Sequence, residues 1–303
     1  MAKQILVIGG TRFFGKLLVQ RLLRAGHRVT IATRGYAPDP FGARIDRVRV
    51  DRRNEHAMRN AFRDAAFDVV FDQMCYSPLD AAIATRVFAG KVKRYVMTST
   101  IDAYRGVAPT GRALREQDLA VQAQRIDTAY PWHDPKRATE CYVSGKVQAE
   151  AYLVRDGSLP VVTVRLAHVL GGPEDFTGRL ACYVDLVRQR GTLGYANAAA
   201  KVSFIEASGA ADFLAWAGMQ DFLGPINAGA EEPLSAFDLH ARVARVLDEP
   251  AHTVKLAQAG GSPFDFAHPL VLDTTRARSL GYHFSHTEEW LDDTIRHHDL
   301  AFV

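Results

Sequence analysis

Three glycines near the start of the chain constrain its fold more than any other feature. The run QILVI at 4–8 is short, apolar and β-branched, and Gly9, Gly10 and Gly15 follow it closely. Apolar residues then recur at helical spacing from Phe13 to Ala25. A buried strand, a glycine turn and a helix in this order are typical of dinucleotide-binding units, because glycine permits close backbone approach and a helix N-terminus attracts a pyrophosphate. The alternative is a tight connecting turn without a ligand.

The alternation of strands and helices continues through the first half of the chain. Further strands are predicted at 27–33, 47–51, 67–73, 93–100 and 160–169, and helices at 55–65, 79–88 and 138–154. This pattern predicts an α/β fold, a Rossmann-type doubly wound parallel sheet with right-handed crossovers. Because the alternation weakens beyond about residue 168, we expect residues 1–167 to form the NAD(P)-binding domain. We expect residues 168–303 to form mainly a smaller C-terminal substrate-binding domain, with some interleaving.

Composition excludes several classes of protein. The chain has 303 residues and a net charge of +3, which is too small to indicate a nucleic-acid partner or a membrane surface. Its three cysteines are widely spaced and have neither a disulfide pattern nor the spacing of a zinc site. No apolar stretch approaches the roughly 20 residues of a membrane span. We therefore expect a cytoplasmic protein that acts on a small molecule and holds no metal.

The end of the second predicted strand bears on cofactor choice. NAD sites usually place an acid there, whereas this strand ends in Thr33-Arg34-Gly35. A guanidinium suits the 2′-phosphate of NADP, which favours NADP over NAD. Arg12, in the glycine turn, could stack on the adenine or bind the same phosphate; the alternative for both arginines is a solvated surface charge. Asp51 could accept a hydrogen bond from the adenine amino group or cap the helix that begins near Asn54.

A tyrosine and a lysine carry the strongest chemical signal. Tyr142 and Lys146 are four residues apart on a predicted helix, so both project from one face. An ammonium beside a phenol favours the phenolate and lowers a pKa that is about 10 in water. Such a tyrosine can exchange a proton with a substrate while hydride moves to or from a nicotinamide. A hydroxyl from Thr100 or Ser99, at the end of the fifth strand, could hold the substrate oxygen, or could only terminate the strand.

Together these motifs resemble the extended short-chain dehydrogenases/reductases, in the branch of NAD(P)-dependent sugar epimerases and dehydratases. The resemblance rests on the glycine turn at 9–15, Asp51, TSTIDAYRG at 98–106, the pair Tyr142 and Lys146, and VRLAHVLGGP at 164–173. The turn GGTRFFG resembles the corresponding turn of an atypical subgroup of this family, in which arginine replaces the middle glycine.

The resemblance implies roles for individual residues. Tyr142 would be the catalytic acid/base, Lys146 would bind the nicotinamide ribose and lower the tyrosine pKa, and Thr100 would be the catalytic hydroxyl. The residues expected to contact the cofactor are Gly9, Thr11, Arg12, Phe13, Phe14, Gly15, Arg34, Asp51, Arg52, Met74, Thr98, Tyr142 and Lys146.

Substrate contacts are expected from Thr100, Asp102, His168 and Lys201. His168 stands where many relatives carry an asparagine, and could donate a hydrogen bond, titrate, or simply pack in a core. Asp102 is half of the acidic pair found in dehydratases, or a capping carboxylate. Lys201 replaces an arginine that clamps a diphosphate, and a lysine cannot form the same bidentate contact. This replacement favours a smaller or unusual substrate.

The predicted function is therefore that of an NAD(P)-dependent oxidoreductase of the epimerase/dehydratase family. It would transfer hydride at a secondary alcohol or ketone carbon of a sugar or nucleotide sugar. The alternatives are an NADPH-dependent ketoreductase acting on a non-sugar small molecule, and a non-catalytic relative that binds a cofactor or RNA. The helices near 79–88 and 138–155 could pair in a homodimer, although Val143, Val147 and Leu153 could equally face the chain's own core.

Overall fold

The structure, a computed structural model, describes residues 1–300 and divides into two compact units. Unit 1 consists of Met1–Ala103, Gln117–Arg165 and Ala211–Ile226. Unit 2 consists of Tyr104–Glu116, Leu166–Ala210 and the residues from Asn227 onward. Compared with the expected boundary after residue 167, a loop at 104–116 joins unit 2 and a later segment at 211–226 joins unit 1.

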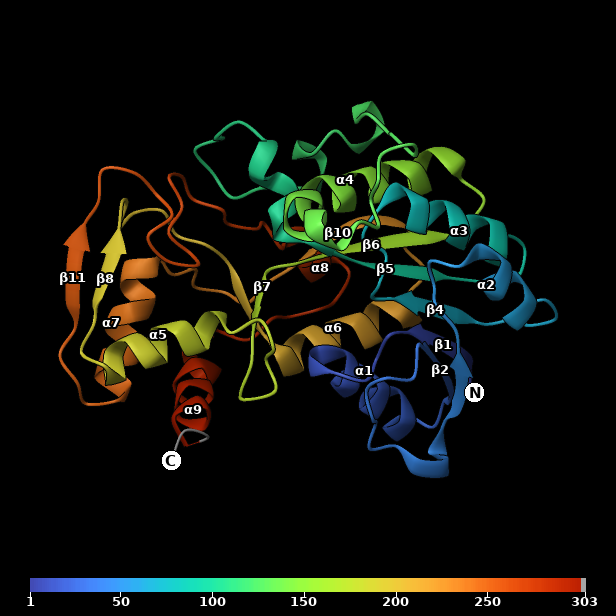
Figure 1. Cartoon of the computed structure of the whole chain (residues 1–303), viewed down its shortest axis with the longest axis horizontal. Helices are drawn as coiled ribbons and strands as arrows, with labels where there is room; N and C mark the ends of the chain where they lie inside the picture. Colours follow the sequence, from blue (N-terminus) through green and yellow to red (C-terminus); the bar gives the residue numbers. More distant parts are fainter. Residues whose placement is uncertain (301–303) are drawn as a thin grey trace. The chain divides into compact units, whose positions relative to one another are not determined.

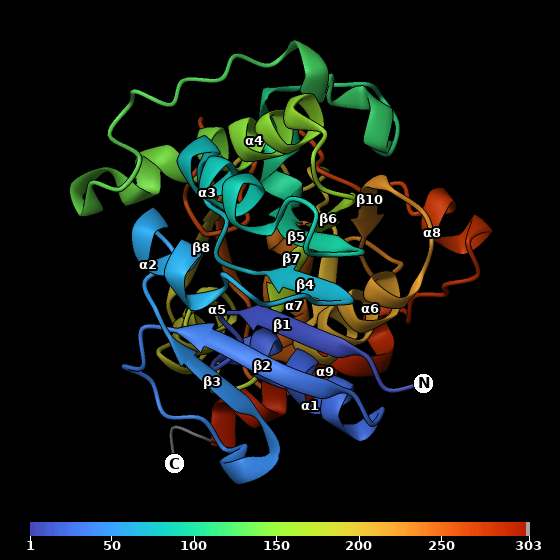
Figure 2. The same ribbon diagram turned by 90° about the vertical axis from the view of Figure 1, so that its right-hand side faces the viewer.

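A parallel seven-stranded sheet forms the centre of unit 1, which confirms the predicted Rossmann-type fold. Its strand order is β10-β6-β5-β4-β1-β2-β3, and Figure 2 shows the strands side by side in this order. The strands are β1 (Gln4–Ile8), β2 (Arg28–Thr33), β3 (Asp46–Arg49), β4 (Val69–Asp72), β5 (Tyr95–Thr100), β6 (Val161–Leu166) and β10 (Gly224–Ala228). The chain turns from one half of the sheet to the other between β1 and β4, and ligands of such sheets bind at this switch point.

Helices cover both faces of this sheet (Figure 1). On one face lie α2 (Glu55–Ala61), α3 (Pro78–Phe88) and α4 (Ala138–Asp156), and on the other lie α1 (Phe13–Arg24) and α6 (Ala207–Met219). The rings of Phe62 and Phe88, with centroids 5.4 Å apart, pack with Met97 in the buried cluster beneath α2, α3 and α4. The two-sided covering explains why β4, β5 and β6 are buried along their whole length.

Two features of the second half differ from the sequence-based expectation. The predicted strand at 160–169 is two strands, since β6 ends at Leu166 and β7 (His168–Leu170) pairs with β9 (Phe204–Glu206) instead. The helix α6 was not expected, because its composition is apolar on nearly all sides and hides a helical period. Gly218 lets α6 approach the sheet, since a Cβ there would lie 2.2 Å from Cζ of Phe71.

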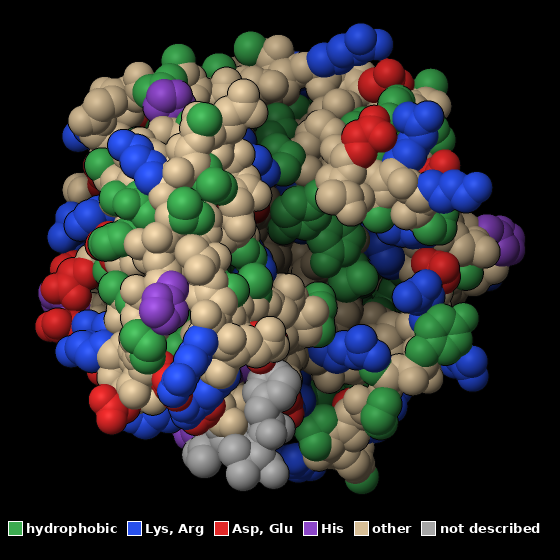
Figure 3. All heavy atoms as spheres, turned by 60° about the vertical axis from the view of Figure 1, so that its left-hand side comes forward, with side chains coloured by type: hydrophobic (Ala, Val, Ile, Leu, Met, Phe, Trp, Pro, Cys, Tyr) green, Lys and Arg blue, Asp and Glu red, His purple; other side chains and the backbone are tan. Residues whose placement is uncertain are grey.

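Unit 2 contains two small parallel sheets, β7–β9 and β8–β11. Its elements include α5 (Arg179–Arg188), β8 (Thr192–Tyr195), α7 (Ala236–Val246), β11 (His252–Lys255), α8 (Thr275–Ser279) and α9 (Thr287–Leu300). A capping box between Ser235 and Asp238 fixes the start of α7. Figure 3 shows that Lys and Arg side chains intermingle with Asp and Glu on the face it draws, in keeping with the small net charge.

One buried ion pair ties α4 to the sheet within unit 1. Glu150 of α4 and Arg165 of β6 are 1% and 0% exposed, and Nη2 of Arg165 lies 2.7 Å from Oε2 of Glu150. The Ser99 hydroxyl of β5 also donates to Glu150. Three elements therefore meet at one carboxylate, which fixes α4 against the strands whose ends carry the candidate site.

Replacing Arg165 tests how strongly this pair holds unit 1 together. Arg165→Leu leaves a buried carboxylate without its partner, so the free energy of unfolding should fall by about 3–5 kcal/mol. Arg59→Leu removes the exposed pair that Arg59 forms with Glu55, and should cost less than about 1 kcal/mol. Urea denaturation followed by circular dichroism measures both. Equal losses in the two variants would contradict the assigned role of Arg165.

Candidate functional site

The glycine turn after β1 has the backbone that a dinucleotide requires. Gly9 and Gly10 have φ angles of +102° and +87°, which favour glycine over residues with a Cβ. The Gly9 N–H donates to the Ala32 carbonyl at 3.0 Å and so fixes the turn beside the end of β2. A Cβ at Gly15 would lie 3.2 Å from the Gly10 Cα and 2.1 Å from Oε1 of Gln73. The turn is therefore closed tightly at the N-terminus of α1.

Polar atoms at the carboxyl edge of the sheet fit a bound dinucleotide. Nε2 of Gln73, directly after β4, and the Thr98 hydroxyl of β5 are both buried, and neither has a hydrogen-bond partner within residues 1–300. Buried polar groups are normally satisfied, so these two indicate a ligand with complementary groups. Thr98 was predicted from the sequence. Gln73 was missed, and its only signal was a polar residue directly after a buried strand.

The residues expected near the adenosine lie mostly on the surface of unit 1. Arg12 and Arg34 are exposed, and they follow β1 and β2, which pair in parallel up to Ile8 and Ala32. The Arg34 guanidinium lies over the Tyr36 ring at 5.1 Å from its centroid. Both turns therefore present a guanidinium at the same edge of the sheet.

Three further predicted residues surround this turn region. Asp51 is exposed, and its carboxylate accepts from the Arg53 N–H at 3.0 Å. Asn54, not Asp51, caps α2, because its side chain accepts from the Ala57 N–H. Met74 is 38% exposed and Phe13 packs edge-on against Phe14 with centroids 5.3 Å apart. Asp51 and Met74 are therefore accessible to a ligand, whereas Phe13 is buried.

Arg52, expected to contact the cofactor, lies in a buried cluster of charged residues. Its side chain is buried and forms ion pairs with Asp72 at the end of β4 and with Asp80 of α3, the latter at 3.0 Å. The Tyr95 hydroxyl donates to the same Asp72 at 2.6 Å, and Nε2 of His133 lies 3.1 Å from Asp80. The two carboxylates hold the guanidinium in place, and a contact between Arg52 and the cofactor stays a prediction.

The charges in this cluster set the protonation of Asp80. Burial alone would raise the pKa of this carboxyl group, but Arg52 and His133 lower it well below its ordinary value. Asp80 is therefore ionised and also accepts from the Tyr76 N–H at 2.9 Å. The Arg52 cluster thus holds the segment between β4 and α3 in position.

Tyr142 and Lys146 lie on one face of α4, as their spacing predicts, but in different surroundings. Tyr142 is 38% exposed, whereas Lys146 is only 2% exposed. The Lys146 ammonium donates to the Thr98 carbonyl oxygen at 2.7 Å, and burial lowers the pKa of Lys146. The lysine is therefore fixed at the carboxyl end of β5, with the tyrosine one helical turn away.

The hydroxyls of Ser99 and Thr100, both buried at the end of β5, have different partners. Ser99 is buried and donates to Glu150. The Thr100 hydroxyl donates to Oδ2 of Asp102 at 3.3 Å and accepts from the Asp102 N–H at 3.2 Å. Asp102 therefore orients the threonine, which is the local turn role that the sequence left open for this carboxylate.

His168, expected to contact substrate, belongs to unit 2 and is buried among aromatic rings. It stacks on Phe266 with centroids 5.8 Å apart and an interplanar angle of 9°. Burial, reinforced by Arg179, lowers the pKa of His168 well below its ordinary value, so the side chain stays neutral and a titrating role is not supported. Nδ1 lies 3.2 Å from the Arg179 guanidinium and must accept from it, which leaves the proton on Nε2. Nε2 is buried without a partner in the described part of the chain.

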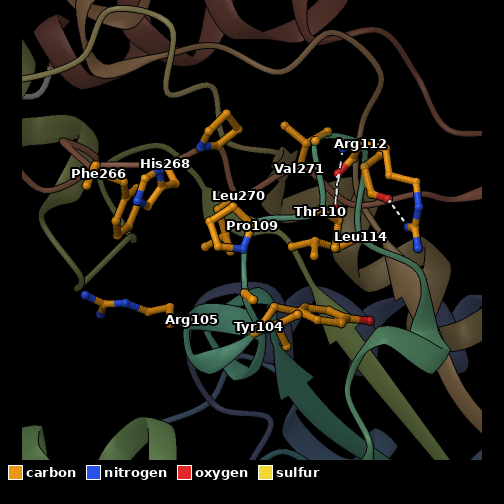
Figure 4. A pocket seen from close by; sticks show the side chains of 16 residues that line it. Tyr104, Arg105, Pro109, Thr110, Arg112, Leu114, Phe266, His268, Leu270 and Val271 are labelled. Carbon is orange, nitrogen blue, oxygen red and sulfur yellow. Dashed lines mark hydrogen bonds between the residues drawn. The ribbon is translucent and has the colours of Figure 1, made fainter.

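Unit 2 also contains a cavity of about 530 Å³, shown in Figure 4. Its walls are the loop at 107–114, which follows Tyr104 and Arg105, and the segment 266–271. Pro109 and Leu270 are among the lining residues labelled in Figure 4, and the Arg105 guanidinium lies 5.3 Å from the centroid of the Phe266 ring. Most of the lining side chains are apolar, as in many small-molecule sites. Lys201 is exposed and does not line this cavity.

Comparison with known proteins decides the family. A sequence model of the NAD dependent epimerase/dehydratase family matches residues 5–217, more than half of the chain. The chain belongs to this family. The prediction of an extended short-chain dehydrogenase/reductase enzyme is thereby confirmed, and family membership supports a nicotinamide cofactor.

Individual relatives share less with the chain. It is 34% identical over 100 residues to 2′-dehydrokanamycin reductase of Streptomyces kanamyceticus, and 34% identical over 83 residues to the chloroplast stem-loop binding protein of 41 kDa b of Arabidopsis thaliana. These matches cover 33% and 23% of this chain, and only 28% and 22% of the relatives' own lengths.

A solved structure is similar over nearly the whole fold. The UDP-glucose 4-epimerase of Thermus thermophilus, in complex with NAD, aligns over 98% of this chain and 99% of its own with a TM-score of 0.75 at 20% identity. This likeness confirms the fold of the family.

Two further findings concern the described residues of both units. None of the helices within residues 1–300 is long and apolar enough to cross a membrane. In the same range, no three His, Cys, Asp or Glu side chains are grouped so that they could hold a metal ion.

The Arg52 cluster makes the stability of this family member depend on pH. The lowered folded-state pKa of Asp80 lies below the unfolded value of about 3.9, so its carboxylate contributes stability that is present above about pH 4 and lost as the pH falls. Asp80→Asn should therefore destabilise the protein at about pH 7, and the difference from the unchanged chain should shrink toward about pH 3.

Thermal unfolding across this pH range measures the effect, with Asp64→Asn on the exposed surface as the control. A difference between Asp80→Asn and the unchanged chain that stays constant with pH would contradict the ionised state assigned to Asp80.

Proposed function

We propose that this chain is an NAD(P)-dependent oxidoreductase that moves hydride at a secondary alcohol or ketone carbon, with Tyr142 as acid/base. The observation that carries the proposal is the arrangement on α4. A buried lysine is held by the Thr98 carbonyl at the carboxyl edge of the sheet, and an accessible tyrosine lies one turn before it. A phenol beside an ammonium at the ligand-binding edge of such a sheet suits proton transfer coupled to hydride transfer.

The chain's own residues divide the chemistry among them. A bound nicotinamide supplies or accepts the hydride. During reduction, the Tyr142 hydroxyl gives its proton to the carbonyl oxygen as that oxygen becomes the hydroxyl of the product. The positive charge of Lys146 stabilises the phenolate that remains, and the Thr100 hydroxyl, oriented by Asp102, holds the reacting oxygen. Oxidation reverses these steps, with the Tyr142 phenolate as the base.

The cofactor would lie against the turn at Gly9, Gly10 and Gly15, with Gln73 and Thr98 as further polar contacts. We propose that NADP is preferred, because Arg12 and Arg34 are both exposed at the edge where β1 and β2 end. No carboxylate follows Thr33 to accept hydrogen bonds from a ribose 2′-hydroxyl. A preference for NADP would also favour net reduction over an epimerase cycle.

Two classes of substrate are candidates, and different observations support each. The similar structure is a UDP-glucose 4-epimerase, which supports a sugar or nucleotide sugar. The second candidate is a ketone without a sugar, and the largely apolar cavity in unit 2 favours it, as does the replacement of a diphosphate-binding arginine by the exposed Lys201. The relative 2′-dehydrokanamycin reductase, by its name, reduces a compound that is not a nucleotide sugar.

Two other readings of the sequence remain as predictions. A non-catalytic RNA-binding role finds support only in the name of the chloroplast relative, and the buried Lys146 beside Tyr142 favours an enzyme.

A homodimer would use α3 and α4, which pack against each other within one chain. Leu153 of α4 is buried in that core, whereas Val143 and Val147 are only partly buried.

Replacing Tyr142 tests the proposed mechanism. Tyr142→Phe keeps the ring but removes the proton, so turnover should fall by about 10²–10⁴-fold while the Kd for NADPH stays unchanged. The probes are NADPH oxidation with acetophenone or 2′-dehydrokanamycin, and epimerisation of UDP-glucose with NAD. Full activity in Tyr142→Phe, or no turnover of any probe by the unchanged protein despite cofactor binding, would contradict the proposal.

Replacing Arg34 tests the cofactor preference. Arg34→Ala removes a guanidinium that would bind a 2′-phosphate, so the Kd for NADPH should rise about tenfold or more while that for NADH changes little. Isothermal titration with both cofactors measures this, and Arg24→Ala, a surface arginine at the far end of α1, is the matched control. An unchanged ratio of the two Kd values would overturn the assignment of Arg34.

A further inference from the structure

Tyr76 contacts both residues of the proposed proton-transfer pair. The Lys146 ammonium lies 4.2 Å from the centroid of the Tyr76 ring, within the range of a cation–π interaction. The Tyr142 ring also lies near Tyr76, with centroids 6.1 Å apart and an interplanar angle of 43°. One aromatic ring from the segment after β4 therefore adjoins both functional side chains of α4.

The backbone of Tyr76 is fixed in this position from two directions. Its N–H donates to Asp80 at 2.9 Å, and Asp80 is held in turn by the buried Arg52. Its carbonyl oxygen presses against α4 at Gly145, where a Cβ would lie only 2.2 Å away. Gly145 thus lets the Tyr76 backbone approach α4 in the turn between Tyr142 and Lys146. The contact between ring and ammonium is set by the fold and not by a flexible surface side chain.

Such a contact matters because Lys146 is almost completely buried. Burial removes water from the ammonium and disfavours its charged form. The groups that face it electrostatically are Asp72 at the end of β4, Cys75 between β4 and α3, Asp80 of α3, and Arg52 from the segment after β3. The first three favour the charge and Arg52 opposes it. The Tyr76 ring is a neutral group that replaces part of the lost hydration, and burial raises the pKa of its own phenol so that the ring stays uncharged.

We propose that Tyr76 is a positioning residue: its ring face holds the protonated ammonium of Lys146 beside Tyr142. This inference rests on the proposed role of Tyr142, because the Tyr76 ring acts on Lys146, and Lys146 affects the reaction by stabilising the Tyr142 phenolate. Within residues 1–300 the Tyr76 hydroxyl makes only a long contact, with the Met74 sulfur at 4.0 Å. The proposal therefore assigns the effect to the ring, and a phenylalanine should replace it.

The test measures the titration of Tyr142 directly, without a substrate. The tyrosinate absorbance of each protein is recorded against pH. The absorbance curve of the same protein with Tyr142→Phe added is then subtracted, which leaves the titration of Tyr142. Tyr76→Leu removes the ring, Lys146 loses its proton more readily, and the pKa of Tyr142 should rise by on the order of one unit. Tyr76→Phe should leave it unchanged. A role in packing alone predicts the opposite sign, because extra water around Tyr142 would stabilise the phenolate.

Two controls separate this effect from a general loss of aromatic packing. Tyr130 is also partly buried and lies 5.5 Å from the Arg137 guanidinium, so Tyr130→Leu removes a similar ring–cation pair at another place in unit 1. It should not shift the titration of Tyr142. In a Lys146→Met background, Tyr76→Leu should also have no further effect, because the cation that transmits it is gone.

The outcomes distinguish this inference from the proposed function. A rise in the pKa of Tyr142 that is confined to Tyr76→Leu and abolished by Lys146→Met supports the inference. If the enzyme is active, the pH at which the rate of ketone reduction falls on the alkaline side should increase by the same amount. No shift, a fall, or an equal shift in Tyr76→Phe overturns it, even if Tyr142→Phe proves inactive. A rise in a protein that turns over none of the probes would leave the role of Tyr76 standing and remove the proposed function.

Discussion

The burial of Arg52 between Asp72 and Asp80 is the interaction on which the site in unit 1 depends. Removing a guanidinium and two carboxylates from water is costly, and their attraction offsets this cost only when the geometry is fixed. The cluster therefore requires the end of β4 and the start of α3 to stay together. Gln73, Met74 and Tyr76 lie on the short segment between those two anchors. The cluster therefore fixes the position of the candidate cofactor contacts Gln73 and Met74 and of the Tyr76 ring beside Lys146.

A second set of close contacts places α4. Glu150 accepts from Arg165 and Ser99, which fixes the helix against β5 and β6. Gly145 lets the chain after β4 press against the same helix. The helical turn with Tyr142 and Lys146 is thus fixed by a contact at Gly145, within the turn, and by the ion pair at Glu150, one turn later. Electrostatic catalysis of this kind works best when the charged groups are already oriented before the reaction begins, and these contacts supply that orientation.

The two units contribute different chemistry. Unit 1 holds the glycine turn, the unsatisfied polar atoms of Gln73 and Thr98, and the pair on α4. Unit 2 holds the neutral His168 among aromatic rings and the cavity lined by its two loops. Polar and charged candidate residues in one unit and a largely apolar cavity in the other suit an enzyme whose cofactor chemistry is common to its family and whose substrate choice is set separately.

Sequence alone determined the elements whose signals are local. The first strand, its glycine turn and α1 could be predicted because a strand, φ-positive glycines and a 3.6-residue period are read from neighbouring residues. The spacing of Tyr142 and Lys146 placed them on one helix face for the same reason. Tertiary structure alone decided the role of Arg52, the contact of Tyr76 with Lys146, the split of β6 from β7 and the return of the 211–226 segment to unit 1. Each depends on partners distant in the chain, and no local pattern specifies which distant side chain will neutralise a buried charge or fill the space beside a glycine.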